Sequence, residues 1–270
     1  MSTPFISLSD IPKGNVKWID CRFSLQDPSR GVKQYEQEHV AGAVHWDLEK
    51  DLSDMSSELG RHPMPSQSDL KELFERSGLH QNDFIVLYDH GGEPFAPRGW
   101  FMLTYANFKN AYILHEGWEE LKRSSLPLDS SIAQPVQKQL DIIWNEDIQM
   151  SKEQVKAVVS KNSGGLLVDA RSEERYFGEY EPIDPIAGRI PGALNYNWER
   201  LKEAGRFKKS DPNLKAALKE EEPITVYCGS GVTAAPLFAM LKQSGYSDVK
   251  LYVGGFSDWI RTERIEKGRS

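Results

Sequence analysis

The sequence predicts an α/β protein of two similar domains in tandem, each with a mostly parallel sheet flanked by helices. Three observations support this fold class. The chain repeats itself once, each copy alternates short β-rich apolar runs with helical stretches, and one apolar run leads through a glycine-rich loop into a helix. With 270 residues, of which 39% are hydrophobic, the chain is long enough for two domains with ordinary cores.

The internal repeat is the strongest sign of how the chain is organised. Four segments of the first half match four of the second: 18–22 with 167–171, 39–44 with 189–194, 84–88 with 223–227, and 116–118 with 254–256. The offsets are 149, 150, 139 and 138 residues, so the order is kept and the spacing is nearly constant. The first copy therefore carries 11 extra residues between Gly42 and Tyr88.

A linker is expected between the two copies. Residues 123–139 hold two prolines and several serines, a composition typical of a connecting segment. We place the boundary near residue 135, which gives one domain over 1–134 and another over 135–270.

Capping signals predict where two of the helices begin. In the first copy, Ser66 or Ser68 begins a helix that Gly78 ends. In the second copy, Ser151 and a glutamine three residues later form a capping box that begins a helix over 153–161.

The strand predicted over 224–227 ends at Cys228, and an apolar helix is predicted from about 234 to 244. Gly229 and Gly231 let the loop between them curl tightly with its N–H groups turned inward. The helix directs its positive end at the same point. Such donors favour an exposed, reactive thiolate, which makes Cys228 a candidate nucleophile; the alternative is a buried structural cysteine.

The run Cys-Gly-Ser-Gly-Val-Thr-Ala, residues 228–234, resembles the active loop of the rhodanese family. Within that family it is similar to the 3-mercaptopyruvate sulfurtransferases, because thiosulfate sulfurtransferases more typically carry Arg and Lys where this chain has Gly229 and Ser230. The resemblance covers nearly the whole chain. It implies that the cysteine takes sulfane sulfur as a persulfide and passes it to an acceptor. Phosphatases of this fold need a longer loop that ends in arginine, and Ala234 excludes them.

The repeat breaks at the reactive position. The first copy has Asp89 where the second has Cys228, so the first domain has no thiol there. Tandem rhodaneses show the same division, which implies a catalytically silent domain over 1–134 and a catalytic one over 135–270. Asp89 and His90 lack further ligands at metal spacing, so we expect no metal and no cofactor.

The extra residues of the first copy resemble a family segment that crosses to the active site. His62 matches the family's active-site histidine, and Glu49 stands where the mercaptopyruvate enzymes more often have an aspartate. Both are therefore implied to line the site. A harmless surface loop is the alternative.

Arginines follow the strand predicted over 166–169. Asp169 beside Arg171 repeats Asp20 beside Arg22, which indicates a structural ion pair in each copy. Arg175 has no such counterpart, and its segment resembles the one whose last arginine holds the anionic substrate. A guanidinium suits a carboxylate through two parallel hydrogen bonds.

The family's second carboxylate-binding arginine is missing from its expected place, because Ile183 follows the Glu-Pro pair at 181–182. Arg189 is nearby but falls where the family usually has a histidine. Ser230 is expected to donate or relay a proton to the leaving enolate; the alternative is that a small residue simply fits the loop. Thr233 is expected to cap the following helix. The complete predicted site comprises Cys228 and Ser230 as catalytic residues and Arg175, Gly229, Gly231, Val232, Thr233, His62 and Glu49 as substrate-binding residues.

The predicted activity is transfer of sulfur from 3-mercaptopyruvate to a thiol or cyanide acceptor, with a thioredoxin-like protein among the candidate acceptors. Thiosulfate:cyanide sulfurtransfer and a persulfide carrier without rapid turnover remain open. The net charge of −7 without basic clusters argues against nucleic acid, and there is no apolar run long enough for a membrane span. Residues 1–10 lack the features of a signal peptide, so we expect a reduced, cytoplasmic setting with Cys21 buried.

Overall fold

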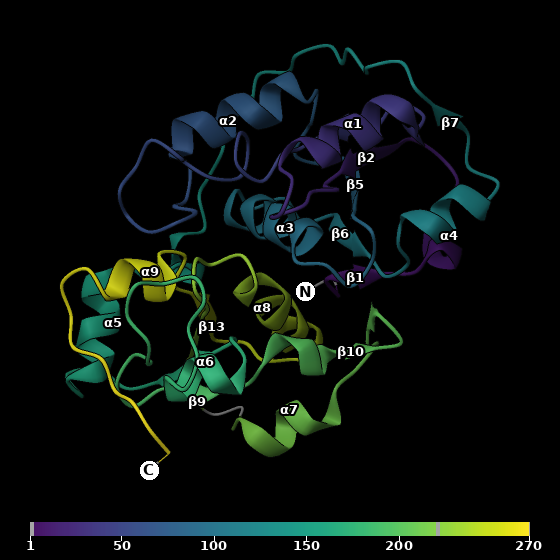
Figure 1. Ribbon diagram of the computed structural model, residues 1–270. Helices are drawn as coiled ribbons and strands as arrows, with labels where there is room; N and C mark the ends of the chain where they lie inside the picture. The colour runs from purple at the N-terminus through teal and green to yellow at the C-terminus, as the bar shows by residue number, and fades with distance from the viewer. Residues whose placement is uncertain (1–2, 220–221, 270) are drawn as a thin grey trace. The chain divides into compact units, whose positions relative to one another are not determined.

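The computed structural model describes residues 3–219 and 222–269 of the chain (Figure 1). The chain divides into two compact units. The first comprises Met1–Asp54, Pro65–Asn145 and Ala204–Lys209, and the second comprises Met55–Met64, Glu146–Glu203 and Ser210–Ser270. Each unit therefore includes one short segment from the other half of the sequence, and the boundary near residue 135 stays a prediction.

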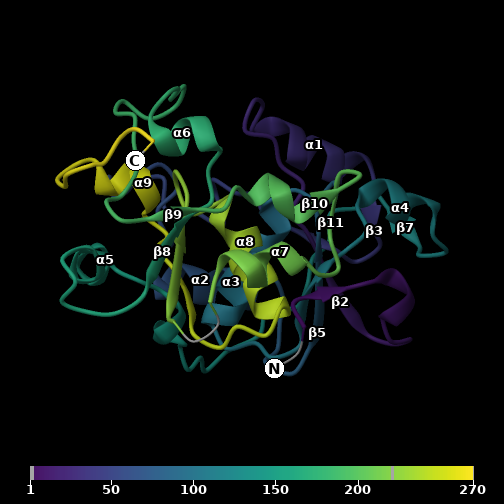
Figure 2. The same cartoon turned by 90° about the horizontal axis from the view of Figure 1, so that it is seen from below.

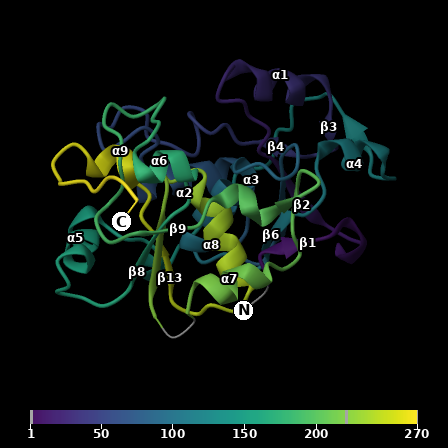
Figure 3. The same ribbon diagram turned by 60° about the horizontal axis from the view of Figure 1, so that its bottom comes forward.

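The first unit is built on a five-stranded sheet in the order β1-β6-β5-β2-β4, with every neighbouring pair parallel. Figure 3 shows β1 at the edge beside β6. The strands are β1 (Phe5–Ile6), β2 (Val16–Asp20), β4 (Val44–His45), β5 (Phe84–Tyr88) and β6 (Ala111–Leu114). The remaining elements are η1 (Leu8–Asp10), α1 (Ser29–Gln37), α2 (Gln67–Arg76), α3 (Phe95–Tyr105), α4 (Trp118–Arg123), β11 (Arg206–Phe207), and the antiparallel pair β3 (His39–Val40) and β7 (Leu128–Asp129).

The second unit has a four-stranded parallel sheet in the order β13-β12-β8-β9. Helix α8 packs against β12 and β13. Figure 2 shows β8 of this sheet between α5 on one side and α8 on the other. The strands are β8 (Leu166–Asp169), β9 (Leu194–Asn195), β12 (Ile224–Tyr227) and β13 (Val249–Leu251). The other elements are η2 (Glu146–Ile148), α5 (Lys152–Val159), α6 (Glu173–Phe177), η3 (Trp198–Leu201), β10 (Lys202–Glu203), α7 (Pro212–Ala217), α8 (Ala234–Gln243) and α9 (Gly255–Trp259). Both units thus confirm the predicted fold class.

The central strand β12 occupies the predicted residues Ile224–Tyr227, and all four are buried. Such uniform burial is expected of a parallel strand that is covered on both faces. Its register pairs Val226 with Val168 on one side and with Leu251 on the other. The strand therefore delivers Cys228 at the carboxyl end of the middle of the sheet, where ligands bind in open α/β folds.

The two predicted serine caps are confirmed, and one of the two helices is shorter than expected. Ser66, not Ser68, caps α2, because its Oγ accepts a hydrogen bond from the backbone N–H of Asp69 at 3.1 Å. Ser151 caps α5 in the expected capping box. That helix ends at Val159 rather than at 161. Lys161 has a φ of +60°, a left-handed conformation that cannot continue a right-handed helix.

Each unit contains the predicted buried Asp–Arg pair behind the carboxyl end of its sheet. Arg22 Nη2 lies 2.6 Å from Asp20 Oδ2, and Arg171 Nη2 lies 2.6 Å from Asp169 Oδ2. Each guanidinium carbon also lies 4.0 Å from the centre of an aromatic ring. The ring is that of Trp118 in the first unit and that of Phe256 in the second. These pairs hold the strand end to the following loops, which is a structural role.

We expect Arg22→Ala to lower the free energy of unfolding by about 3–5 kcal/mol, because it leaves Asp20 buried and without its guanidinium. Urea unfolding followed by circular dichroism measures the change. Arg123→Ala is the matched control: it breaks the Arg123–Glu119 pair, which is largely exposed, and should cost less than about 1 kcal/mol. Equal losses in the two variants would contradict the structural role of the buried pair.

Candidate functional site

The loop after Cys228 is held in shape by backbone contacts with the start of α9. The carbonyl of Cys228 accepts a hydrogen bond from Phe256 N at 2.7 Å, and that of Gly229 accepts one from Ser257 N at 2.9 Å. Gly231 has a φ of +73°, and a Cβ there would lie 2.4 Å from the carbonyl oxygen of Val253. Only glycine fits this position, because a side chain would meet both backbone strain and a clash.

Two expectations about the loop need correction. Cys228 is 1% exposed, so its thiol is buried in this state rather than open to solvent. Thr233 stands at the N-cap position of α8 but makes no side-chain cap hydrogen bond. Its φ of −76° and ψ of −5° are helical, whereas a capping side chain needs an extended backbone at this position.

The donors predicted around the thiol are available for a ligand. In the described part of the chain, the backbone N–H groups of Gly229, Val232 and Thr233 donate no hydrogen bond. They lie between the end of β12 and the N-terminus of α8, whose dipole favours negative charge. A thiolate or persulfide at Cys228 is the anion that this loop can stabilise.

Ser230 and His62 lie in contact, although 168 residues separate them in the sequence. His62 Nδ1 lies 3.0 Å from Ser230 Oγ, and the two residues are 8% and 6% exposed. A buried hydroxyl bonded to an imidazole can pass a proton in either direction, depending on the tautomer. The geometry thus joins two of the predicted site residues beside the cysteine loop.

The segment Met55–Met64 brings His62 to this position, because it belongs to the second unit. Arg61 N donates to Ser257 Oγ at 3.1 Å, and Glu58 pairs with Arg261 at 3.1 Å. Gly60 has a φ of +106°, and a Cβ there would lie 2.9 Å from a backbone oxygen. A glycine is therefore needed where the segment approaches the loop before α9.

A chain of alternating charges runs beside the loop. Arg171 bonds Glu181 at 3.1 Å, Arg175 bonds both Glu181 at 2.9 Å and Asp184 at 3.0 Å, and Arg61 bonds Asp184 at 3.0 Å. Burial alone would raise the pKa of Glu181, but hydrogen bonds, first from Arg175, lower it below its ordinary value. Burial raises the pKa of Asp184 above its ordinary value, against the opposing charge of Arg61. The ionised form of Asp184 therefore depends on its guanidinium partners.

Two guanidinium groups face the residue next to the cysteine. A Cβ built on Gly229 would lie 2.2 Å from Arg61 Nη2 and 3.3 Å from Arg175 Nη2. Arg175 was predicted for the site, whereas Arg61 and Asp184 were missed. Their signals were present in the sequence: Arg61 directly precedes His62, and Asp184 follows the Glu-Pro pair where an arginine was sought.

Arg189 and Glu49 make other contacts. Arg189 is 2% exposed and is engaged with Glu266 and, at 2.9 Å, with the carbonyl of Gly268, so it does not supply the missing arginine. Glu49 lies in the first unit, where its backbone N–H donates to Asp47 at 2.9 Å. A part for Glu49 in the site stays a prediction.

The equivalent loop of the first unit binds a carboxylate of its own. Asp89 Oδ1 accepts a hydrogen bond from Gly91 N at 2.7 Å, and Oδ2 accepts one from Ala96 N at 3.0 Å. Burial raises the pKa of Asp89 to about 6, although these backbone donors oppose the rise. The donors at the start of α3 are thus occupied by a side chain that has no nucleophilic sulfur.

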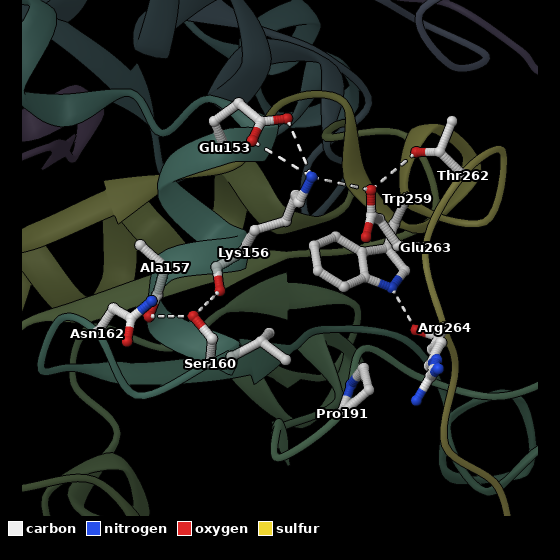
Figure 4. A pocket seen from close by; sticks show the side chains of 11 residues that line it. Glu153, Lys156, Ala157, Ser160, Asn162, Pro191, Trp259, Thr262, Glu263 and Arg264 are labelled. Carbon is white, nitrogen blue, oxygen red and sulfur yellow. Dashed lines mark hydrogen bonds and ion pairs between the residues drawn. The ribbon is translucent and has the colours of Figure 1, made fainter.

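A surface pocket of about 710 Å³ lies elsewhere in the second unit, around α5 and Trp259 (Figure 4). Its polar groups bond one another: Lys156 pairs with Glu153 and Glu263 at 3.3 Å, and Trp259 Nε1 donates to the carbonyl of Arg264 at 2.8 Å. None of the predicted site residues lines it. Within residues 3–219 and 222–269, no helix is both long and apolar enough to cross a membrane.

Comparison with known proteins places this geometry in a family. The rhodanese-like domain model matches residues 8–124 and 151–262. A probable 3-mercaptopyruvate sulfurtransferase of Pseudomonas aeruginosa is 35% identical, with 91% of this chain and 89% of the relative covered. A putative thiosulfate sulfurtransferase of Mycobacterium tuberculosis is 32% identical, with 94% and 91% covered.

A solved structure agrees in fold. The crystal structure of SseA from Escherichia coli, described as a 3-mercaptopyruvate sulfotransferase with the rhodanese fold, has a TM-score of 0.79 and 29% identity. It covers 95% of this chain and 100% of its own. The chain belongs to the rhodanese-like family, with one copy of the domain in each half, and is a sulfurtransferase.

Proposed function

We propose that the protein transfers sulfur from 3-mercaptopyruvate to a thiol or cyanide acceptor through a persulfide on Cys228. The observation that carries this proposal is the contact of 3.0 Å between Ser230 Oγ and His62 Nδ1. The absence of a cationic side chain at 229 and 230 agrees with it. Departure of pyruvate as an enolate needs a proton source, and this pair supplies one.

In the first half-reaction, the Cys228 thiolate attacks the sulfur of mercaptopyruvate. An S–S bond forms and the C–S bond breaks, with its electron pair passing to carbon to give the pyruvate enolate. The proton of the substrate thiol passes through Ser230 and His62 to the enolate carbon, so the products are pyruvate and the Cys228 persulfide anion. No external oxidant or reductant is needed.

In the second half-reaction, the acceptor attacks the outer sulfur of the persulfide and Cys228 leaves as a thiolate. The loop N–H groups of Gly229, Val232 and Thr233 stabilise the anion in both halves, as preorganised dipoles do for developing charge. Arg175 contributes positive charge near the donor's carboxylate. We further propose that the domain over 1–134 is silent, since Asp89 replaces the thiol.

The acceptor and compartment are proposed more broadly. A thioredoxin-like protein or a small thiol fits as acceptor, because the outer sulfur of a persulfide reacts with any thiolate that reaches it. A reduced cytoplasm fits two cysteines that are both unpaired. The alternatives are a thiosulfate:cyanide sulfurtransferase and a persulfide carrier without rapid turnover. The first agrees with one relative's name, which is that of a putative thiosulfate sulfurtransferase.

A side-by-side assay with the two donors tests the proposal. We expect kcat/KM for 3-mercaptopyruvate to exceed that for thiosulfate by roughly tenfold or more, because thiosulfate is a dianion and an unmatched charge near a buried loop costs on the order of 1.4 kcal/mol or more. A tenfold preference for thiosulfate would favour the first alternative. Uptake of sulfur without turnover to cyanide or small thiols would favour the carrier.

A further inference from the structure

The alternating charges beside the loop are not equally compensated. In the described part of the chain, Arg175 has two carboxylate partners, Glu181 and Asp184, and its side chain is 16% exposed. Arg61 has one, Asp184, which it shares with Arg175, and its side chain is 31% exposed. Arg61 therefore ends the chain of charges and keeps the larger uncompensated positive charge.

Arg61 also lies nearer to the reactive loop. Its Nη2 would be 2.2 Å from a Cβ on Gly229, compared with 3.3 Å for Arg175 Nη2. Asp184 binds the Nε edge of Arg61 at 3.0 Å and Nη2 at 3.3 Å, which fixes the plane of the guanidinium. A guanidinium held in this way can present its remaining N–H groups to a carboxylate.

We propose that Arg61, rather than Arg175, is the main binding group for the carboxylate of the sulfur donor, and that Arg175 acts by positioning Asp184. This inference rests on the proposed function, since it names the group that selects the donor. Arg61 would then take the role expected of the arginine that is missing after the Glu-Pro pair. It lies on the segment Met55–Met64, next to His62. The same segment then supplies both the proton relay and the anion site.

The absence of a side chain at Gly229 belongs to the same arrangement. A residue with a Cβ at 229 must push the Arg61 guanidinium away, because 2.2 Å is far below contact distance. The guanidinium is the far end of a flexible side chain, so it can move without unfolding the loop. A cationic side chain at position 229 and the guanidinium of Arg61 are therefore alternative ways to place positive charge beside the cysteine loop.

The test compares two donors that differ only in the carboxylate: 3-mercaptopyruvate and 1-mercaptopropan-2-one, in which a methyl group replaces it. We expect Arg61→Ala to lower kcat/KM for mercaptopyruvate by roughly tenfold or more, because a charge-assisted fork is lost, and to change the neutral ketone less than about twofold. Arg61→Lys should recover part of the loss, since a lysine keeps the charge without the fork. Gly229→Ala should act in the same direction as Arg61→Ala.

Two controls separate this role from a structural one. Arg261→Ala removes the contact of Glu58 that holds the same segment and should leave the preference between the donors unchanged. Arg175→Ala should reduce the preference less than Arg61→Ala does. The inference would be overturned if Arg61→Ala lowered kcat/KM equally for both donors. It would also be overturned if the preference for mercaptopyruvate stayed unchanged in Arg61→Ala but was lost in Arg175→Ala.

A binding measurement makes the inference independent of turnover. Calorimetric titration of mercaptopyruvate into Cys228→Ser gives a Kd without reaction, and we expect that Kd to rise roughly tenfold or more in Cys228→Ser with Arg61→Ala. If native protein moves no sulfur from mercaptopyruvate, the proposed function fails. If native protein is active but the Kd does not change, only the inference about Arg61 fails.

Discussion

Cys228→Ser should abolish sulfur transfer, with kcat reduced on the order of 10⁴-fold or more, because a serine hydroxyl stays protonated and is a far poorer nucleophile than a thiolate. The measurement is pyruvate release from 3-mercaptopyruvate in the presence of cyanide. Mass spectrometry of native protein exposed to the donor without an acceptor should show one added sulfur atom, located on Cys228.

Cys21→Ala is the matched control for that result. Cys21 is fully buried in the first unit, and burial, with the charges of Asp20, Asp89 and Asp51, raises the pKa of its thiol well above the ordinary value. It is therefore neutral and inert at physiological pH. We expect Cys21→Ala to keep nearly full activity, and sulfur found on Cys21 in native protein would show that the site is wrongly assigned.

The second large effect is expected at the proton relay. Ser230→Ala and His62→Ala should each lower kcat for mercaptopyruvate by about 10²–10³-fold, in the range typical of general acid–base groups. Because the two side chains share one hydrogen bond at 3.0 Å, the double variant should lose little more than either single variant. Steady-state kinetics of the four proteins gives this comparison.

The two half-reactions provide the control within one protein. Attack of cyanide on a persulfide needs no proton, so Ser230→Ala and His62→Ala loaded with sulfur from polysulfide should release thiocyanate at close to the native rate. If both half-reactions slow by the same factor, the two residues maintain the loop rather than move a proton, and the relay is disproved.

Local chemistry made much of the fold predictable. The strand Ile224–Tyr227 and the start of α8 at Ala234 were predicted within a residue, because a continuous apolar run followed by glycines admits few other conformations. The Ser66 and Ser151 caps were recognisable for the same reason, since a cap depends on residues three positions apart. The end of α5 was not, because Lys161 adopts a left-handed conformation that its side chain does not signal.

Contacts between residues that are far apart in the sequence could not be predicted from local sequence patterns. Assignment of Met55–Met64 to the second unit depends on Gly60, Arg61 and Glu58 meeting residues about 200 positions away. A fragment that begins at residue 135 would therefore lack this segment, and with it His62. The role proposed for Arg61 could not be predicted from the sequence, because its partner, Asp184, stands where an arginine was expected.

The sequence by itself determined the two-domain α/β repeat, the cysteine at the end of the central strand, the glycine loop and the carboxylate that replaces the thiol in the first copy. Those features are set by periodicity, by backbone freedom at glycine and by residue chemistry at one place in the chain. Only the tertiary structure decided that Cys228 is buried, that His62 bonds Ser230 and that Arg61 faces Gly229. All three are fixed by the summed contacts of the folded unit rather than by any local preference, and the last two depend on where the distant segment Met55–Met64 packs.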